Sequence, residues 1–171
     1  MRLTRPREAA PRVLCMTHAL VPASYVLLLR GPLGEEEILL HLRQNTGYRD
    51  GHWAMIAGHV DADESARTAA QREAYEETGV SIAPDALEPL TTLHRWVRGG
   101  PAIEQRVDFF WIARAWDGDP RIVEPEKASD QRWFNLRDLP QPGVEHELVV
   151  IEAYLRGPVP PILTLTSHAT R

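Results

Sequence analysis

The sequence predicts an α/β fold of the α+β kind, in which helices sandwich a mixed β-sheet. Two observations support this prediction. Short runs rich in β-branched and apolar residues recur along the chain and are bounded by glycine and proline turns. Two longer segments between these runs carry the signals of helices. With 171 residues, the chain is long enough for one domain with a sizeable core.

The expected strands come both before and after the first helix in the sequence. The Gly-Pro-Leu-Gly turn at 31–34 predicts a hairpin between the first two strands. The run at 107–115 is almost continuously apolar, which is typical of a strand in the middle of a sheet. The expected strands are residues 24–30, 37–43, 53–57, 90–97, 107–115 and 131–136.

The first helix is expected to begin after Ser65, whose hydroxyl can accept a hydrogen bond from a first-turn amide. Its four alanines favour the helical conformation. Gly79 can adopt the left-handed conformation that ends a helix. A second helix is expected at 144–155.

These elements divide the chain into three parts. The domain is expected at 13–156, after a flexible arm at 1–12. The tail at 157–171 is rich in proline and threonine, and we expect it to be irregular.

Three glutamates gather on the last turn of the first helix. At about 100° per residue, Glu73, Glu76 and Glu77 continue the face that the alanines form, where packing side chains would otherwise lie. Two like charges about 5 Å apart cost roughly 3 kcal/mol at an effective dielectric constant of about 20. An acidic last turn also opposes the helix dipole, which disfavours a merely solvated helix end. A divalent cation that prefers oxygen ligands, Mg²⁺ or Mn²⁺, accounts for the cluster better.

The same glutamates belong to a longer motif, the segment 58–80, GHVDADESARTAAQREAYEETGV. This segment is similar to the box of the Nudix hydrolase family. The fixed positions of that box are filled here by Gly58, Glu64, Arg72, Glu73, Glu76, Glu77 and Gly79. Ala74 takes an apolar position where leucine or isoleucine is usual. Chance agreement at seven fixed positions is negligible, and the chain from about residue 19 to 155 also resembles the family.

The resemblance implies a Nudix-type α/β/α sandwich with a catalytic loop–helix–loop. It also implies a metal-dependent enzyme in which water attacks phosphorus and cleaves the pyrophosphate bond of a nucleoside diphosphate linked to another moiety. The products would be a nucleoside monophosphate and a phosphorylated remainder. By position, the metal ligands would be the Ala57 carbonyl, Glu73, Glu76 and Glu77. Glu73 would also orient or deprotonate the attacking water, and Arg72 and Glu64 would brace the loop. Gly58 is expected to lie at the substrate.

Several residues outside the box are further candidates. Glu124 and Glu126 lie where many relatives bring in one more acidic residue, and Glu126 is taken as the catalytic candidate. Tyr48 is expected to contact the substrate by stacking on a nucleobase. Ile56 and Ala57 replace the proline and glycine that usually precede the box, so we expect a less rigid segment there.

Net charge, cysteine content and the absence of long apolar runs exclude several classes of partner and location. A net charge of −5 argues against a general nucleic-acid binder, which normally carries a basic stripe. Cys15 is the single cysteine, so it excludes internal disulfides, and we expect it to be a small buried residue. The charged first residues are unlike a signal peptide, and no apolar run is long enough for a membrane span. We therefore expect a cytoplasmic protein that acts on a small-molecule nucleotide, and the resemblance allows a homodimer.

The substrate class stays open at this point. None of the family's subgroup signatures is present, and Arg95 stands near the position of the proline that marks many ADP-ribose hydrolases. A nucleoside triphosphate or a nucleotide sugar fits what remains. A non-catalytic regulatory module is an alternative, which the intact glutamates disfavour. An isopentenyl diphosphate isomerase is another, and it is disfavoured because Cys15 lies far from the box in the sequence.

Overall fold

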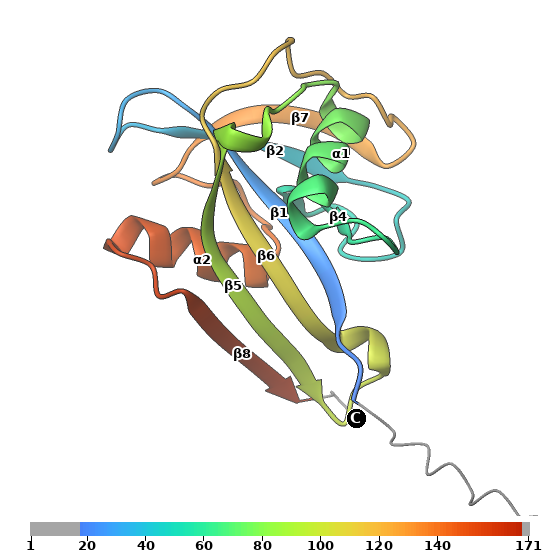
Figure 1. Cartoon of the computed structure of the whole chain (residues 1–171). Coiled ribbons are helices and arrows are strands. Elements are labelled where there is room, and N and C mark those ends of the chain that lie inside the picture. The colour runs from blue at the N-terminus through green and yellow to red at the C-terminus, as the bar shows by residue number, and fades with distance from the viewer. Residues whose placement is uncertain (1–17, 169–171) are drawn as a thin grey trace, which may run out of the picture.

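A mixed β-sheet with one helix on each face forms the protein (Figure 1), a computed structural model in which residues 18–168 are described. The helices are α1 (Ala66–Thr78) and α2 (Glu145–Arg156), with short 3-10 turns η1 (Pro84–Ala86) and η2 (Ala102–Glu104). The strands are β1 (Val21–Arg30), β2 (Glu37–Arg43), β3 (Trp53–Ala54), β4 (Ile56–His59), β5 (Leu87–Arg98), β6 (Gln105–Ala113), β7 (Ala128–Asn135) and β8 (Ile162–His168).

The strand order is β3-β2-β1-β6-β5-β8, with β4 paired to β1 and β7 paired to β2. The β1–β6 and β5–β8 pairs are parallel and the other pairs are antiparallel, so the predicted mixed sheet is confirmed. Strand β6 lies between β1 and β5, which is the central position that its apolar sequence predicts.

Alternation along β1 divides the core between the two helices. Leu27 and Leu29 point to the face where Val150 and Ile151 of α2 pack. Val26 and Leu28 point to the opposite face, where the alanines of α1 pack. Since successive side chains of a strand face opposite sides, β1 needs apolar residues at every position here. The α/β/α sandwich is confirmed.

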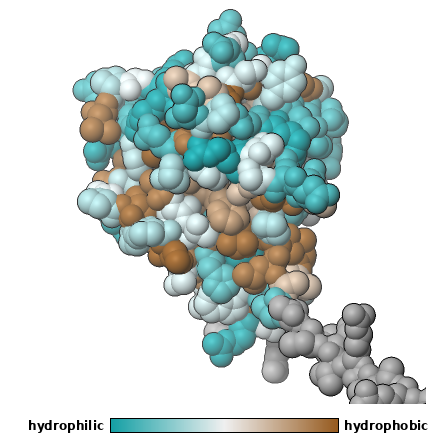
Figure 2. All heavy atoms as spheres, in the orientation of Figure 1, coloured by the Kyte–Doolittle hydropathy of each residue, from teal (hydrophilic) through white to brown (hydrophobic). Residues whose placement is uncertain are grey.

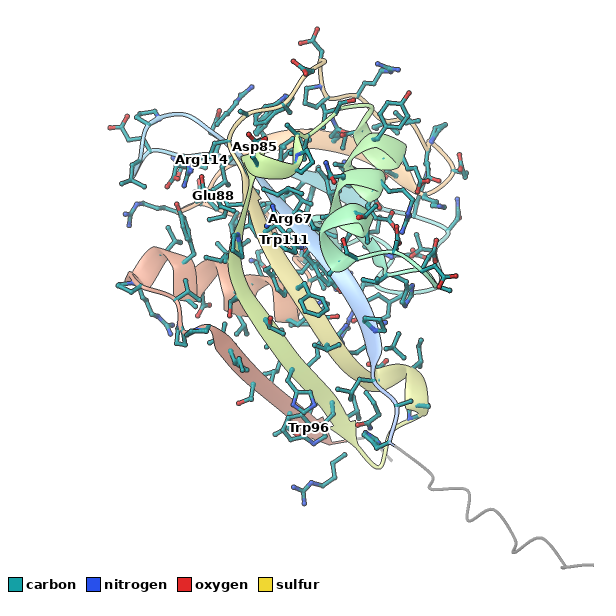
Figure 3. The ribbon with its side chains drawn as sticks, viewed as in Figure 1. Arg67, Asp85, Glu88, Trp96, Trp111 and Arg114 are labelled. Carbon is teal, nitrogen blue, oxygen red and sulfur yellow. The ribbon has the colours of Figure 1, made fainter. Side chains whose placement is uncertain are left out.

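Helix α1 begins and ends at the two residues that the sequence indicates. The Ser65 hydroxyl accepts a hydrogen bond from the Thr68 N–H at 3.1 Å. Gly79 has φ 74°, and its N–H donates to the Tyr75 carbonyl at 2.8 Å. Arg67 fixes the helix to the sheet, because its guanidinium lies 4.8 Å from the Trp111 ring centroid and donates to the Leu87 carbonyl (Figure 3).

Two expectations about secondary structure are wrong. The tail is not irregular throughout, because β8 runs parallel to β5. The prolines that suggested irregularity precede this strand, and Leu163 and Leu165 pack on the core. The expected strand at 53–57 is two strands, β3 on β2 and β4 on β1. They are interrupted at Met55, whose N–H donates to the Glu147 carboxylate at 2.6 Å.

The expected arm at 1–12 and Cys15 lie outside the described residues. Within residues 18–168, no helix has the length and apolar character that crossing a membrane requires. The surface over α1 and its flanking loops is largely hydrophilic, whereas apolar side chains on the same face gather lower, toward the η2 end of the sheet (Figure 2). Ile103 of η2 is one of these exposed apolar residues.

Candidate active site

The motif helix lies directly against strand β4, and Gly58 makes this approach possible. A Cβ atom added to Gly58 would lie 1.8 Å from the Glu73 Oε1 atom and 2.0 Å from its Cδ atom. No side chain fits at position 58 unless the Glu73 carboxylate moves. The glycine of the motif is therefore required by the position of a glutamate fifteen residues later.

Arg72 holds the carboxylates of the motif together. Its guanidinium donates to Glu64 Oε1 at 2.7 Å, to Glu73 Oε1 at 2.7 Å and to Glu76 Oε2 at 3.0 Å. It also donates to the His59 carbonyl at 3.0 Å, which ties the helix to the end of β4. The hydrogen bonds from Arg72 hold the pKa of Glu64 below its usual value. The structure thus brings Arg72 and Glu64 into the bracing contact that the resemblance implies.

Among the carboxylates of the motif, Glu73 and Glu77 are the two whose pKa burial raises. Burial raises the pKa of Glu77 well above its usual value, and the charge of Glu73 raises it further. A backbone hydrogen bond with Ala57 acts in the opposite direction. Burial also raises the pKa of Glu73, against the effect of Arg72. The Glu77 Oε2 atom is buried and has no hydrogen-bond partner among residues 18–168.

This unpartnered carboxylate oxygen fits a hard divalent cation. A buried acceptor without a donor is costly, and an ion such as Mg²⁺ or Mn²⁺ would satisfy it. The bound cation would also offset the repulsion between Glu73 and Glu77. These two side chains and the Ala57 backbone line one cavity, so the residues present are suited to such an ion.

Glu76 lies elsewhere. Its side chain is 48% exposed and pairs with Arg72, one helical turn earlier, at 3.0 Å. This ion pair draws Glu76 toward solvent and away from the cavity that Glu73 and Glu77 line. Among residues 18–168, no three histidine, cysteine or acidic side chains already stand together as a ligand group. The arrangement is therefore one in which Glu76 must turn from Arg72 to reach an ion.

Two adjoining cavities meet at the end of β4. The first, of about 330 Å³, is lined by Glu73, Glu77 and Lys127 among others. The second, of about 350 Å³, extends toward α2 and is lined by Glu147 among others. The residues common to both linings are Arg43, Thr46, Ala57, Gly58 and His59. The two cavities therefore adjoin at these residues, and together they extend from the carboxylates to α2.

The candidates outside the motif are placed differently from each other. Glu124 lines the first cavity and pairs with Lys127 at 2.7 Å. Glu126, the expected catalytic candidate, is exposed and does not line this cavity, so the structure places Glu124 there instead. The two residues belong to a turn, in which the Lys127 N–H donates to the Glu124 carbonyl at 3.0 Å. Tyr48 is 39% exposed and lines the second cavity, where its ring can meet a ligand.

Three buried polar groups escape the sequence interpretation. Asp108 on β6 is fully buried between Arg95, at 2.5 Å, and Arg106, at 3.4 Å. Glu147 on α2 is buried and lines the second cavity, and its burial raises its pKa to about 8. His41 is buried in the middle of β2 and lines the first cavity. Asp108 and His41 each interrupt an apolar strand, and that interruption is the signal that could have revealed them.

The model of the NUDIX domain family matches residues 20–154, which is most of the chain. The chain belongs to this family. It is 30% identical to a MutT NUDIX hydrolase from Burkholderia pseudomallei, with 77% of this chain and 96% of that chain covered and a TM-score of 0.64.

Two curated relatives are also similar to this Nudix chain. NAD-capped RNA hydrolase NudC from Stutzerimonas stutzeri is 29% identical over 138 residues, which cover 80% of this chain and 45% of NudC. Phosphatase NudJ from Escherichia coli is 42% identical over 45 residues, which cover 26% of this chain and 28% of NudJ. The matched parts thus span less than half the length of either relative.

Proposed function

We propose that this Nudix protein is a metal-dependent hydrolase that cleaves a pyrophosphate bond in a nucleoside diphosphate derivative, by attack of water on phosphorus. The observation that carries the proposal is the buried Glu77 carboxylate beside Glu73, one oxygen of which has no hydrogen-bond partner among the described residues, in a cavity that adjoins a second one. Carboxylates held in this way suit a hard cation, and a phosphate chain needs such a cation to be attacked by water.

Glu73 and Glu77 would hold the Mg²⁺ or Mn²⁺ ion, joined by the Ala57 carbonyl and by Glu76 once it leaves Arg72. When bound, the ion would lower the pKa of water and neutralise phosphate oxygens. Glu73 is fixed between Gly58 and Arg72, so one of its oxygens has a defined direction for orienting the nucleophile. Glu124, which also lines the first cavity, is the second candidate for accepting the proton.

The cations of the two cavities are placed to bind the phosphate chain. Lys127 lines the first cavity and Arg43 lines both, so together they span the junction between the two spaces. Arg43 is fixed there by donating to the Tyr48 carbonyl at 3.0 Å and to the Thr46 hydroxyl at 3.0 Å. The second cavity would then receive the nucleoside or the group linked to it, with Tyr48 at its rim.

A panel of substrates tests this proposal. It should contain nucleoside triphosphates, nucleotide sugars, dinucleotides such as NAD, and isopentenyl diphosphate, each with Mg²⁺ or Mn²⁺. Reaction in ¹⁸O-labelled water shows which phosphorus is attacked. We expect release of a nucleoside monophosphate from at least one nucleotide. Isomerisation of isopentenyl diphosphate, or tight nucleotide binding with no turnover of any compound, would contradict the proposal and favour the isomerase or the regulatory module.

A further inference from the structure

Three buried side-chain atoms near the first cavity lack any hydrogen-bond partner in the part of the chain that the structure describes. They are His41 Nε2, Glu77 Oε2 and Gln131 Oε1. His41 and Gln131 are directly opposite each other in the β2–β7 ladder, and Glu77 of α1 approaches His41. The His41 Nε2 and Gln131 Oε1 atoms can satisfy each other as donor and acceptor. Because buried polar groups are rarely left unpaired, the Glu77 oxygen beside His41 is the atom that indicates a missing partner.

The geometry at His41 identifies the kind of partner. The His41 side chain is only 7% exposed, and its Nδ1 atom lies 3.6 Å from Glu77 Oε2. That distance is too long for a hydrogen bond. The distance does suit two ligand atoms that bind the same metal ion. With metal–ligand bonds of about 2.1 Å, the two ligand atoms are about 3.0 Å apart when the angle at the metal is 90° and about 4.2 Å apart when it is 180°.

We propose that His41 Nδ1 is a nitrogen ligand of the divalent ion that Glu77 holds, an inference that rests on the proposed function. Imidazole suits first-row transition metals, whereas Mg²⁺ prefers oxygen ligands alone. The site therefore favours Mn²⁺ or Co²⁺ over Mg²⁺. Gln131 completes the arrangement, since its Oε1 can accept the Nε2 proton and leave Nδ1 free to bind the metal.

His59 is the rival nitrogen donor, because it also lines the first cavity. Its Nε2 atom accepts a hydrogen bond from Arg106 Nη1 at 2.8 Å, so this nitrogen is already occupied. The two histidines therefore differ in one decisive respect. The Nε2 lone pair of His59 has a donor, while within residues 18–168 the Nδ1 atom of His41 forms no hydrogen bond.

Pulsed EPR of the Mn²⁺-loaded full chain tests the assignment without relying on turnover. We expect a ¹⁴N coupling to Mn²⁺ in the wild type, and its replacement by the ¹⁵N pattern when all histidines are ¹⁵N-labelled. The labelling needs no substitution, so it works even if a His41 variant folds poorly. The coupling should disappear in His41→Gln and persist in His59→Gln.

Titration calorimetry gives the matching affinities. His41→Gln should weaken Mn²⁺ binding by at least about 10-fold and weaken Mg²⁺ binding less. His59→Gln should change neither the Mn²⁺ affinity nor the Mg²⁺ affinity. Bound Mn²⁺ without a nitrogen coupling would overturn the inference and leave the proposed function intact. A coupling that is lost only in His59→Gln would overturn it as well. Failure to bind Mn²⁺ at all would overturn both the inference and the proposed function.

Discussion

Replacing Gly58 by alanine perturbs the candidate site through one atom. The backbone at Gly58 lies in β4 and outside the left-handed region, so alanine is compatible with it. The new Cβ atom would, however, lie 1.8 Å from Glu73 Oε1. Ordinary contact requires about 3.4 Å, so the carboxylate must move by about 1.6 Å. The displaced group is the far end of a flexible side chain, and the fold can accommodate the change.

The expected consequence is a loss of activity with little loss of stability. A misplacement of about 1 Å in a catalytic group can cost about 10²-fold in rate. We therefore expect kcat to fall at least about 10²-fold, which corresponds to about 2.7 kcal/mol of lost transition-state stabilisation. Since alanine at a compatible position restricts the unfolded chain, the thermal midpoint should change by only a few degrees.

The assay is kcat on the best substrate of the panel, with the thermal midpoint measured by calorimetry. Gly34→Ala is the control for activity, because no described atom lies within 4 Å of its added Cβ and it should leave kcat unchanged. Its φ of 91° makes alanine strained there, so this control should lower the thermal midpoint while Gly58→Ala changes it little. Combining Gly58→Ala with Glu73→Gln should add no further loss beyond Glu73→Gln alone, since both changes act on one carboxylate. A Gly58→Ala variant with kcat near that of the wild type would refute the reasoning.

Three further predictions concern the carboxylates. Burial raises the pKa of Glu147 from 4.5 to about 8. The contribution of Glu147 to the free energy of unfolding is therefore fully present below about pH 4.5, and it is lost as the pH rises through 8. Glu147→Gln should therefore raise the thermal midpoint at pH 8 more than at pH 5, and equal shifts at both would contradict this. Glu124→Gln should lower kcat at least about 10-fold while Glu126→Gln leaves it unchanged, and the reverse order would restore Glu126 as the candidate. Activity should vanish in EDTA and in Glu73→Gln with the circular dichroism spectrum preserved, so turnover without metal would exclude the proposed chemistry.

The sequence predicts those elements whose signals are local. Ser65 and Gly79 fix the two ends of α1 by hydrogen bonds within a few residues, so their types suffice. The apolar run of β6 likewise indicates burial on both faces. Strand β8 could not be predicted in this way, because its pairing with β5 is distant in sequence and nearby prolines obscure it. Local patterns specify caps and periodicity, whereas register between distant strands depends on tertiary packing.

In the candidate site, too, local sequence signals predict some features and tertiary contacts determine the others. The motif identifies the carboxylates, yet it does not show that Glu76 faces Arg72 or that Glu124 is the one facing inward. Asp108 and His41 were missed because a single polar residue within an apolar strand has no pattern of its own. Their meaning comes from partners on other strands, which are Arg95 for Asp108 and Gln131 for His41.

The segment before the motif shows how the fold replaces a missing local restraint. Without the usual proline and glycine, Ile56 and Ala57 suggest a less rigid loop. In the structure they belong to β4, where Ile56 pairs with Val26 and Ala57 with Tyr25 of the central strand β1. A backbone that is hydrogen-bonded to a central strand has little freedom left, so the pairing with β1 restrains Ala57 in place of the usual proline and glycine. The position of the Ala57 backbone beside Glu77 is therefore set by the sheet, and loosening β1–β4 pairing should displace it more than any change in the polar loop at 44–52.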